Sequence, residues 1–297
     1  DLHSFPTRRS SDLRTYKMFL LFDIGGTKTR LAVVSPKTTK ISPEEVVIFP
    51  TPTLFNHGIE QIVDTALRLA KGNKIKSGGG GIGALLDKSK TSIINYSNKP
   101  TLIDWDHKPI KKELEKKLNC KIYLENDAAL CGLGEAIFGA GRKSSLIAYL
   151  TIGTGVGGVK IENGAIDQNY FGFEPGKQLL EIGTNQISTL EALIGGRFIK
   201  EKFQILPSDI QDSVFWQNIE YYLSIGLHNA ALFWSPEKIV LGGSIINYLS
   251  LDRIKVQFER LLANFPQKPL IEKAILGELS GLYGALHYLK NSVNSKQ

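Results

Sequence analysis

The stretch that decides the fold is residues 19–35, FLLFDIGGTKTRLAVVS. An apolar run ends in an acid, two glycines follow, and a second β-branched run leads away. This pattern predicts two antiparallel strands joined by a tight turn. Gly25 and Gly26 are expected to take positive φ values and to bring the backbone close to a ligand. Polar groups surround the turn, supplied by Asp23, Thr27, Lys28 and Thr29.

These polar groups, one carboxylate, two hydroxyls and an ammonium, suit a phosphate with its metal ion. A Walker A loop is excluded, because G-x-x-x-x-G-K-[ST] is absent and a strand, not a helix, follows the glycines. An ordinary glycine-rich hairpin with polar decoration stays open as the alternative, since short glycine motifs give many false positives.

A second stretch of the same design is residues 146–164, LIAYLTIGTGVGGVKIENG. Gly153, Gly155 and Gly158 formally match the dinucleotide fingerprint G-x-G-x-x-G. That fingerprint should open a helix, however, and VKIEN opens a strand. The stretch therefore predicts a second hairpin, in which Thr154 and the backbone amides would hold phosphate and face the first hairpin across a cleft.

Asn126 and Asp127 stand where the predicted strand 121–125, KIYLE, ends and a helix of small residues begins. In α/β proteins ligands bind at the carboxyl ends of strands, and the helix dipole favours an ionised acid in the first turn. The alternative is that Asp127 serves only as the helix N-cap.

Separated acids and amides predict a site that grips several hydroxyl groups, because carboxylates and amides accept and donate in the pattern that a polyol presents. Glu174 lies in the loop 170–176, YFGFEPG, and Glu191 lies in the first turns of a long helix that begins at residue 190. Asn98 lies in the loop 95–109, which is expected to be exposed together with its Trp105 and His107. Taken singly, each of these residues is better explained as a solvated surface residue.

The rest of the chain alternates strand and helix patterns, which is typical of an α/β protein. The glycine-loaded segment 76–86, KSGGGGIGALL, is either a strand or a flexible linker. The other predicted strands are 45–49 and the segment 235–244, and the other predicted helices are 59–71, 110–118, 219–234, 251–264 and 279–289.

Composition bounds the class of protein. The 297 residues are enough for about two domains at roughly 150 residues each. Apolar residues make up 42% of the chain, and no window approaches the length of a membrane span. The net charge of +7 is spread along the chain, which gives little support to a nucleic-acid partner. The only two cysteines, Cys120 and Cys131, suggest no disulfide framework, so a reducing cytoplasm is expected.

Residues 1–17, DLHSFPTRRSSDLRTYK, are polar and lack the apolar centre of a signal peptide. They resemble the translation of a sequencing-adaptor oligonucleotide. We therefore expect a non-native leader, with Met18 as the native start.

Taken in order, these features resemble the ROK family (repressor, open reading frame, kinase) of sugar kinases, within the actin-like ATPase superfamily. The most specific pieces are DIGGTKTR, ENDAAL, TIGTGVGG, FEPG and PEKIVLGG. The resemblance implies a two-domain α/β fold in which each half has a ribonuclease H-like sheet and a nucleotide cleft lies between the domains. The implied boundaries are 18–125 and 126–278, with helix 279–292 packing back on the first domain.

The resemblance also implies roles for individual residues. Asp127 would be the general base of an ATP-dependent hexose kinase, most simply a glucokinase acting on the C6 hydroxyl. Sugar hydroxyls would be held by Asn98, Asn126, Glu174 and Glu191. The first phosphate loop would be Asp23, Gly25, Gly26, Thr27 and Lys28, and the second Thr154, Gly155 and Gly157. Gly242 and Gly243 would line the adenosine, Mg²⁺ would bind with ATP near Asp23, and the protein would be a homodimer.

One departure concerns zinc. Family members carry a His after E-x-G and a cysteine cluster before the sugar-binding Glu. Here Lys177 replaces the His, and residues 179–190 contain no cysteine, so no zinc is expected.

Because some zinc-less relatives use polyphosphate, the phosphoryl donor stays open. N-acetylmannosamine kinase, fructokinase and a catalytically silent sugar-binding protein remain alternatives. A ROK repressor is disfavoured, since DIGGT begins five residues after Met18 and leaves no room for a helix-turn-helix.

Overall fold

A computed structural model describes residues 16–94, 100–170, 172–182 and 187–294. It contains two five-stranded sheets of the same topology. The first has the order β3-β2-β1-β4-β7 and the second the order β10-β9-β8-β13-β14. In each sheet three antiparallel strands are followed by two strands parallel to the central one. This repeat confirms the predicted α/β fold with a ribonuclease H-like sheet in each half.

The strands have the following bounds. Those of the first sheet are β1 (Lys17–Ile24), β2 (Lys28–Val34), β3 (Val47–Pro50), β4 (Lys74–Ile82) and β7 (Lys121–Asn126). Those of the second are β8 (Leu146–Ile152), β9 (Val156–Glu162), β10 (Ala165–Ile166), β13 (Lys238–Gly242) and β14 (Leu270–Lys273). Two short hairpins are formed by β5 (Leu85–Leu86) with β6 (Ile93–Ile94), and by β11 (Leu179–Ile182) with β12 (Ile187–Thr189).

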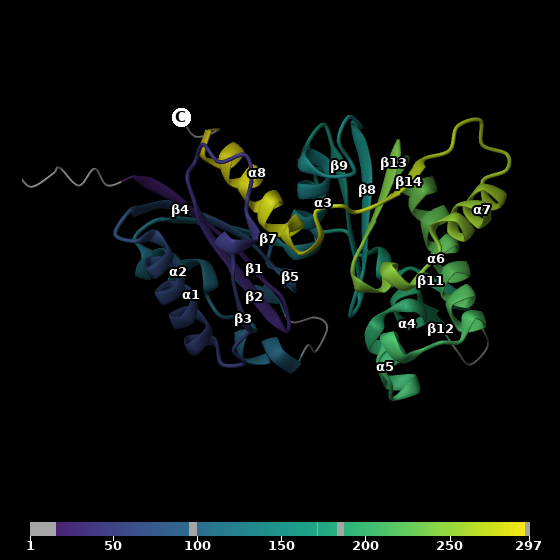
Figure 1. Cartoon of the computed structure of the whole chain (residues 1–297), viewed down its shortest axis with the longest axis horizontal. Helices are drawn as coiled ribbons and strands as arrows, with labels where there is room; N and C mark the ends of the chain where they lie inside the picture. The colour runs from purple at the N-terminus through teal and green to yellow at the C-terminus, as the bar shows by residue number, and fades with distance from the viewer. Residues whose placement is uncertain (1–15, 95–99, 171, 183–186, 295–297) are drawn as a thin grey trace, which may run out of the picture.

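The helices cover both faces of both sheets (Figure 1). On the outer face of the first sheet lie α1 (Phe55–Ala70) and α2 (Ile110–Leu118). Between the two sheets lie α3 (Asp127–Phe138) and α8 (Ser280–Asn294). On the outer side of the second sheet lie α4 (Leu190–Ile194), α6 (Ser213–Trp234) and α7 (Leu251–Leu261), with α5 (Gly196–Phe203) after α4. None of the described helices is both long and apolar enough to cross a bilayer.

The alternation of side chains along each central strand explains these layers. In β1, Leu20 and Phe22 pack on the outer helices, whereas Phe19 and Leu21 pack on α3 and α8. In β8, Tyr149 likewise faces the central helices, while its neighbours on the chain face the outer layer. Both faces of both sheets are therefore buried, which is why the central strands are almost continuously apolar.

The two central helices cross with their backbones in contact, and glycines make this possible. A methyl group added at Gly134 would lie 2.1 Å from the carbonyl oxygen of Ser280. One added at Gly284 would lie 1.8 Å from the carbonyl oxygen of Leu130. Since a carbon atom needs more than 3 Å from such an oxygen, only glycine fits at either position.

The segment 76–82 is a strand and not a linker, because its glycines lie in the middle of the first sheet. Their missing side chains make room for bulky neighbours on both faces. A methyl group at Gly78 would lie 2.6 Å from Ile122 Cδ1, and one at Gly79 would lie 3.2 Å from Leu289 Cβ. The glycine run thus lets the central helix α8 approach the sheet closely.

The expectation that Trp105 is exposed is wrong. Its ring is fully buried at the end of a 3₁₀ segment, Pro100–Trp105. The indole Nε1 donates a 3.0 Å hydrogen bond to the carbonyl oxygen of Pro52, and the ring meets Phe55 edge-on with centroids 5.4 Å apart. Gly58 leaves the space for this ring, because a methyl group there would lie 2.1 Å from it. Burial of one large aromatic surface thus outweighs the polar sequence around it.

The predicted long helix from residue 190 is also wrong. α4 ends after one turn at Gly195, whose ψ of 143° is extended, and α5 begins at the next residue. The backbone N–H of Gly196 donates to the Gly153 carbonyl at 2.8 Å, and that of Arg197 donates to the Thr154 carbonyl at 2.9 Å. The helix is interrupted because the start of α5 binds the second hairpin.

Candidate active site

The first hairpin is held by its own backbone. The N–H of Gly25 donates to the carbonyl of Lys28 at 3.0 Å, and a methyl group on Gly25 would lie 3.1 Å from that oxygen. Neither Gly25 nor Gly26 has a φ in the left-handed region, so the expected positive φ values are wrong. At Gly25 glycine serves close approach of the backbone. Thr27 and Lys28 are exposed at the tip of the turn.

Thr29, in contrast, points into the protein. Its hydroxyl is fully buried and lies 2.9 Å from the hydroxyl of Thr51, which in turn donates to the Gly25 carbonyl at 2.7 Å. This pair of threonine hydroxyls stabilises the turn on its buried side. Thr29 is therefore a structural residue of the hairpin and does not surround the ligand side of the turn.

Asp23 ends the first strand in a buried, charged environment. Its carboxylate is 14% exposed and forms an ion pair of 3.3 Å with Arg30, which also lies 3.1 Å from Glu278 Oε2. Burial, and next the negative charge of Asp127, raise the pKa of Asp23 from 3.8 to about 7, although Arg30 opposes the shift. A cation close to both acids would reverse this shift, so the pair of carboxylates favours a positively charged ligand.

The raised pKa predicts a pH dependence of stability. In the unliganded protein the folded state binds the Asp23 proton up to about pH 7, whereas the unfolded state loses it near pH 4. The contribution of Asp23 to the free energy of unfolding is therefore fully present below about pH 4 and is lost as the pH rises to about 7. In Asp23→Asn the loss is absent. Relative to wild type, the variant's free energy of unfolding should therefore rise from about pH 4 to pH 7 in urea titrations with a chelator present. Asp64→Asn, at an exposed acid on α1, is the matched control. A flat difference for Asp23→Asn would contradict the assignment.

Asp127 lies in the first turn of α3, and the helix cap is its neighbour. The side-chain oxygen of Asn126 accepts from the N–H of Ala129 at 3.1 Å, which makes Asn126 the N-cap. The alternative that Asp127 serves only as N-cap is thus wrong. Its Oδ1 accepts from the N–H of Ala128 at 2.8 Å. Its Oδ2 lies on the side of Gly83.

The free side of the Asp127 carboxylate faces the first hairpin across Gly83. A methyl group on Gly83 would lie 2.9 Å from Asp127 Oδ2 and 3.5 Å from Gly25 Cα. A side chain at position 83 would therefore separate the carboxylate from the turn. Glycine at position 83 therefore lets the Asp127 carboxylate lie close to the backbone of the first hairpin.

The second hairpin approaches the same helix end from the other sheet. A methyl group on Gly157 would lie 3.0 Å from the Cβ of Ala128, which follows Asp127. Thr154 is exposed at the tip of the turn. The amino terminus of α3 thus lies between Gly25 and Gly83 on one side and Gly157 on the other.

The end of β13 lies beside the base of the second hairpin. Gly243 has a φ of +90°, and a methyl group on it would lie 2.2 Å from the carbonyl oxygen of Ile152. A methyl group on Gly242 would lie 2.3 Å from the Tyr149 hydroxyl. Both the left-handed backbone and the close approach require glycine at position 243.

Glu191 is tied to the second hairpin. One carboxylate oxygen accepts from the N–H of Val156 at 2.9 Å, and the other accepts from the ammonium of Lys177 at 2.6 Å. Gly155 allows this approach, because a methyl group there would lie 2.4 Å from Glu191 Oε2. Glu174 is exposed immediately before the 3₁₀ turn Pro175–Lys177. Asn98 lies outside the described residues.

Several polar residues at this site were not singled out from the sequence. Arg30 bridges Asp23 and Glu278, and its partner Glu278 is so distant along the chain that no local pattern links them. Glu125 is 6% exposed, accepts from the N–H of Asn126 at 2.9 Å and is paired with Lys90. A charged residue inside a buried strand is the signal that could have identified Glu125.

The residues present fit Mg²⁺ bound together with a nucleotide. Mg²⁺ is held in proteins by one or two carboxylates and by substrate phosphates. Asp23 supplies a carboxylate beside the first turn, and Asp127 is close enough to raise its pKa. Within the part of the chain that the structure describes, no three His, Cys, Asp or Glu side chains are grouped to hold a metal without a substrate.

This geometry agrees with comparisons to known proteins. The sequence model of the ROK family matches residues 20–188 and 191–292. The chain belongs to the ROK family.

Its relatives within the ROK family are named as kinases of different sugars. A glucokinase of Streptomyces coelicolor is 24% identical, with 89% of this chain and 94% of the relative covered. A fructokinase of Lactococcus lactis is 27% identical, with 85% and 88% covered. An N-acetyl-D-glucosamine kinase of Histophilus somni is 27% identical, with 90% and 97% covered.

Solved ROK structures share the fold. A ROK hexokinase from Thermus thermophilus superposes with a TM-score of 0.77 at 26% identity, covering 93% of this chain and 99% of that one. A ROK family glucokinase from Streptomyces griseus, in complex with glucose and AMPPNP, superposes with a TM-score of 0.74 at 24% identity, covering 91% and 98%. The actin-like ATPase fold of these kinases is the fold of this chain.

Proposed function

We propose that this ROK protein transfers a phosphoryl group from ATP to the C6 hydroxyl of a hexose, with glucose as the first substrate to test. The observation that carries the proposal is the placement of the Asp127 carboxylate at the amino terminus of α3, directed past Gly83 toward the Gly25 turn. The family relationship and the names of the relatives support the same activity.

In this proposal Asp127 is the general base. A sugar hydroxyl is a poor nucleophile, so a carboxylate at about 2.6–3.2 Å must orient it and accept its proton. The hydroxyl would lie beside Asp127 Oδ2, the carboxylate oxygen on the Gly83 side. The first hairpin, with Thr27 and Lys28 at its tip, and the second, with Thr154, Gly155 and Gly157, would surround the phosphates with amides and polar side chains. Gly242 and Gly243 would border the adenosine.

Mg²⁺ bound with the nucleotide would offset negative charge on the phosphates. Asp23 is the residue proposed to hold it, directly or through water, with Arg30 keeping the carboxylate in place.

The sugar would be bound by Asn126, Glu174 and Glu191, with Asn98 as a further candidate. Asn126 already uses its side-chain oxygen for the helix cap, so its amide N–H₂ is the part left to contact a hydroxyl. Glu191 is tied to Lys177 and Val156, and in this arrangement Lys177 would be the donor beside the sugar. Fructose and N-acetylglucosamine are alternative substrates, because relatives of similar identity are named as kinases of these sugars. N-acetylmannosamine is the further alternative expected from the sequence.

A coupled assay tests the proposal directly. The purified chain is given glucose, fructose, mannose and the two N-acetylhexosamines, each with ATP and Mg²⁺ or with polyphosphate. We expect the highest kcat/KM for glucose with ATP. A higher value for another hexose would change only the substrate. The absence of turnover with every pair, together with saturable glucose binding, would favour the catalytically silent sugar-binding alternative.

Zinc is not expected to contribute to the fold. Lys177 stands after E-x-G and is paired with Glu191, and residues 179–190 supply no cysteine. We therefore expect a chelator to leave the thermal unfolding midpoint unchanged, because structural zinc sites contribute directly to folding free energy. Stoichiometric zinc in the purified chain, measured by atomic emission, would contradict this prediction.

A further inference from the structure

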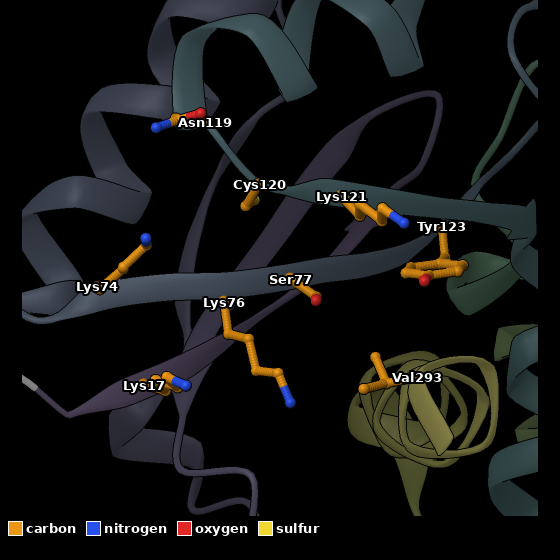
Figure 2. A pocket seen from close by; sticks show the side chains of 9 residues that line it. All are labelled: Lys17, Lys74, Lys76, Ser77, Asn119, Cys120, Lys121, Tyr123 and Val293. Carbon is orange, nitrogen blue, oxygen red and sulfur yellow. The ribbon is translucent and has the colours of Figure 1, made fainter. Parts of the chain in front are cut away.

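A cavity of about 460 Å³ opens at the amino-terminal ends of β1, β4 and β7, beside the last turn of α8. Four lysines line it: Lys17, Lys74, Lys76 and Lys121. Lys17 belongs to the segment expected above to be a non-native leader, so Lys74, Lys76 and Lys121 are the lysines that the native chain contributes. We refer to it as the lysine cavity. Figure 2 shows these side chains on three neighbouring strands, with Tyr123 and Val293 beyond them on the α8 side. Lys121 lies beside Tyr123 on β7, so basic and aromatic groups meet within the cavity.

The lysines of the cavity have no paired acid within the described part of the chain, although the Glu115 carboxylate is close enough to Cys120 to contribute to the raised pKa of its thiol. None of the four ammonium groups has an ion pair or a hydrogen bond among the described residues, and no acidic residue lines the cavity. Like charges around a concave surface raise the local positive potential and attract an anion. Lys17, Lys74 and Lys121 are exposed and Lys76 is half-buried. The more buried Arg30 and Lys238 each meet a carboxylate.

The backbone contributes to this arrangement through a β-bulge at Lys76. In the pairing of β1 with β4, Met18 is opposite Ile75 and Phe19 is opposite Ser77, so Lys76 is an extra residue. Bulges are rare between parallel strands, and they redirect a side chain relative to regular pleating. Here the bulge places half-buried Lys76 next to Ser77, which is 5% exposed, and both line the cavity.

The lysine cavity is separate from the candidate active site. β1 runs over eight residues from Lys17 in the cavity to Ile24 beside the first turn. At about 3.3 Å per residue, the two ends are more than about 20 Å apart. β7 also starts in the cavity, with Lys121, and ends at Asn126, directly before Asp127. A ligand in the cavity is thus not a substrate bound at Asp127.

We propose that the lysine cavity binds a small molecule that carries a doubly charged phosphate group. Lysine ammonium groups bind phosphate as point charges, and Ser77 and Asn119 supply further polar contacts. The volume lies within the usual range for small-molecule sites, about 300–1,000 Å³. Tyr123 and Val293 would contact a less polar part of the ligand. Free phosphate and a phosphorylated sugar share the required chemistry.

Cys120 lines the same cavity and provides a local readout. Alkylation of Cys120 by iodoacetamide is followed by mass spectrometry of its peptide, at mildly alkaline pH, because burial raises the pKa of the thiol to about 11. The probes are inorganic phosphate, pyrophosphate and glucose 6-phosphate, with glucose as the uncharged control. We expect saturable protection of Cys120 by at least one phosphate probe, no protection by glucose, and weaker protection at high salt. The probe that protects identifies the source of the phosphate.

Paired variants test the role of the lysines. Lys76→Gln with Lys121→Gln should raise the half-protecting concentration by about tenfold or more, since each removes a charged contact. The matched control is Lys255→Gln with Lys268→Gln, one half-buried and one exposed lysine in the other half of the chain, which should leave protection unchanged. Asp127→Asn should also leave it unchanged, so the result does not depend on the proposed kinase activity. Unsaturable protection, no protection by any phosphate probe, or equal loss in both double variants would overturn the proposal.

Discussion

Asp127→Asn is expected to lower turnover by about two or more orders of magnitude while changing the KM for the sugar little. The amide has the same shape as the carboxylate and can still accept from the N–H of Ala128, so the amino terminus of α3 should keep its geometry. It cannot take a proton from a sugar hydroxyl at neutral pH. The loss should therefore appear in kcat, because the proton is transferred only as the bond to phosphorus forms.

Steady-state kinetics with ATP and the preferred hexose measure this effect, and calorimetric binding of the sugar checks that the site is intact. Asp64→Asn, an exposed acid on α1, is the control and should have wild-type kcat. A wild-type rate for Asp127→Asn would remove the residue from the mechanism. A lost sugar affinity with unchanged kcat would instead make Asp127 a binding residue.

Gly284→Ala should destabilise the protein by about 2 kcal/mol or more, the cost of overpacking a tight contact. Helix propensity alone predicts the opposite sign, a gain of about 1 kcal/mol for Ala over Gly within a helix. The structure decides between them, since the added methyl group would lie 1.8 Å from the Leu130 carbonyl oxygen in α3. The two central helices would have to separate.

Chemical unfolding with urea measures the change in the free energy of unfolding. Gly281→Ala, one turn earlier on α8, is the matched control. Its methyl group would lie 3.4 Å from the nearest atom, Asp23 Cγ, which is an ordinary contact. We expect that variant to be as stable as wild type or more stable, by up to about 1 kcal/mol from helix propensity. A stabilised Gly284→Ala would show that α3 and α8 do not meet as closely as described.

Much of the architecture could be predicted from the order of local patterns. The two glycine hairpins, the strand that precedes Asp127 and helix α2 follow from alternation and spacing, because each pattern is determined by its own neighbours. The glycine segment at 76–82 was ambiguous between strand and linker. Its neighbours Ile122 and Leu289 decide this, and they come from distant parts of the chain.

Two of the errors, at Trp105 and at the helix after residue 190, share one cause, which is contact between segments far apart in sequence. Trp105 is buried because Pro52, Phe55 and Gly58 accept its ring. The helix after residue 190 is interrupted because the second hairpin binds the N–H groups of the next helix. The cap at α3 could not be assigned to Asn126 or Asp127 without coordinates, because both residue types are good caps. The residues proposed for the sugar, the nucleotide and the base still await the experiments above.

The central position of α8 has a consequence for biosynthesis. The inner face of the first sheet, with Phe19 and Leu21, is among the earliest described parts of the chain to be translated, yet α8, at residues 280–294, covers it. That apolar face must stay without this partner until α8 has emerged from the ribosome. The nascent chain is therefore open to aggregation and to chaperone capture over most of its translation.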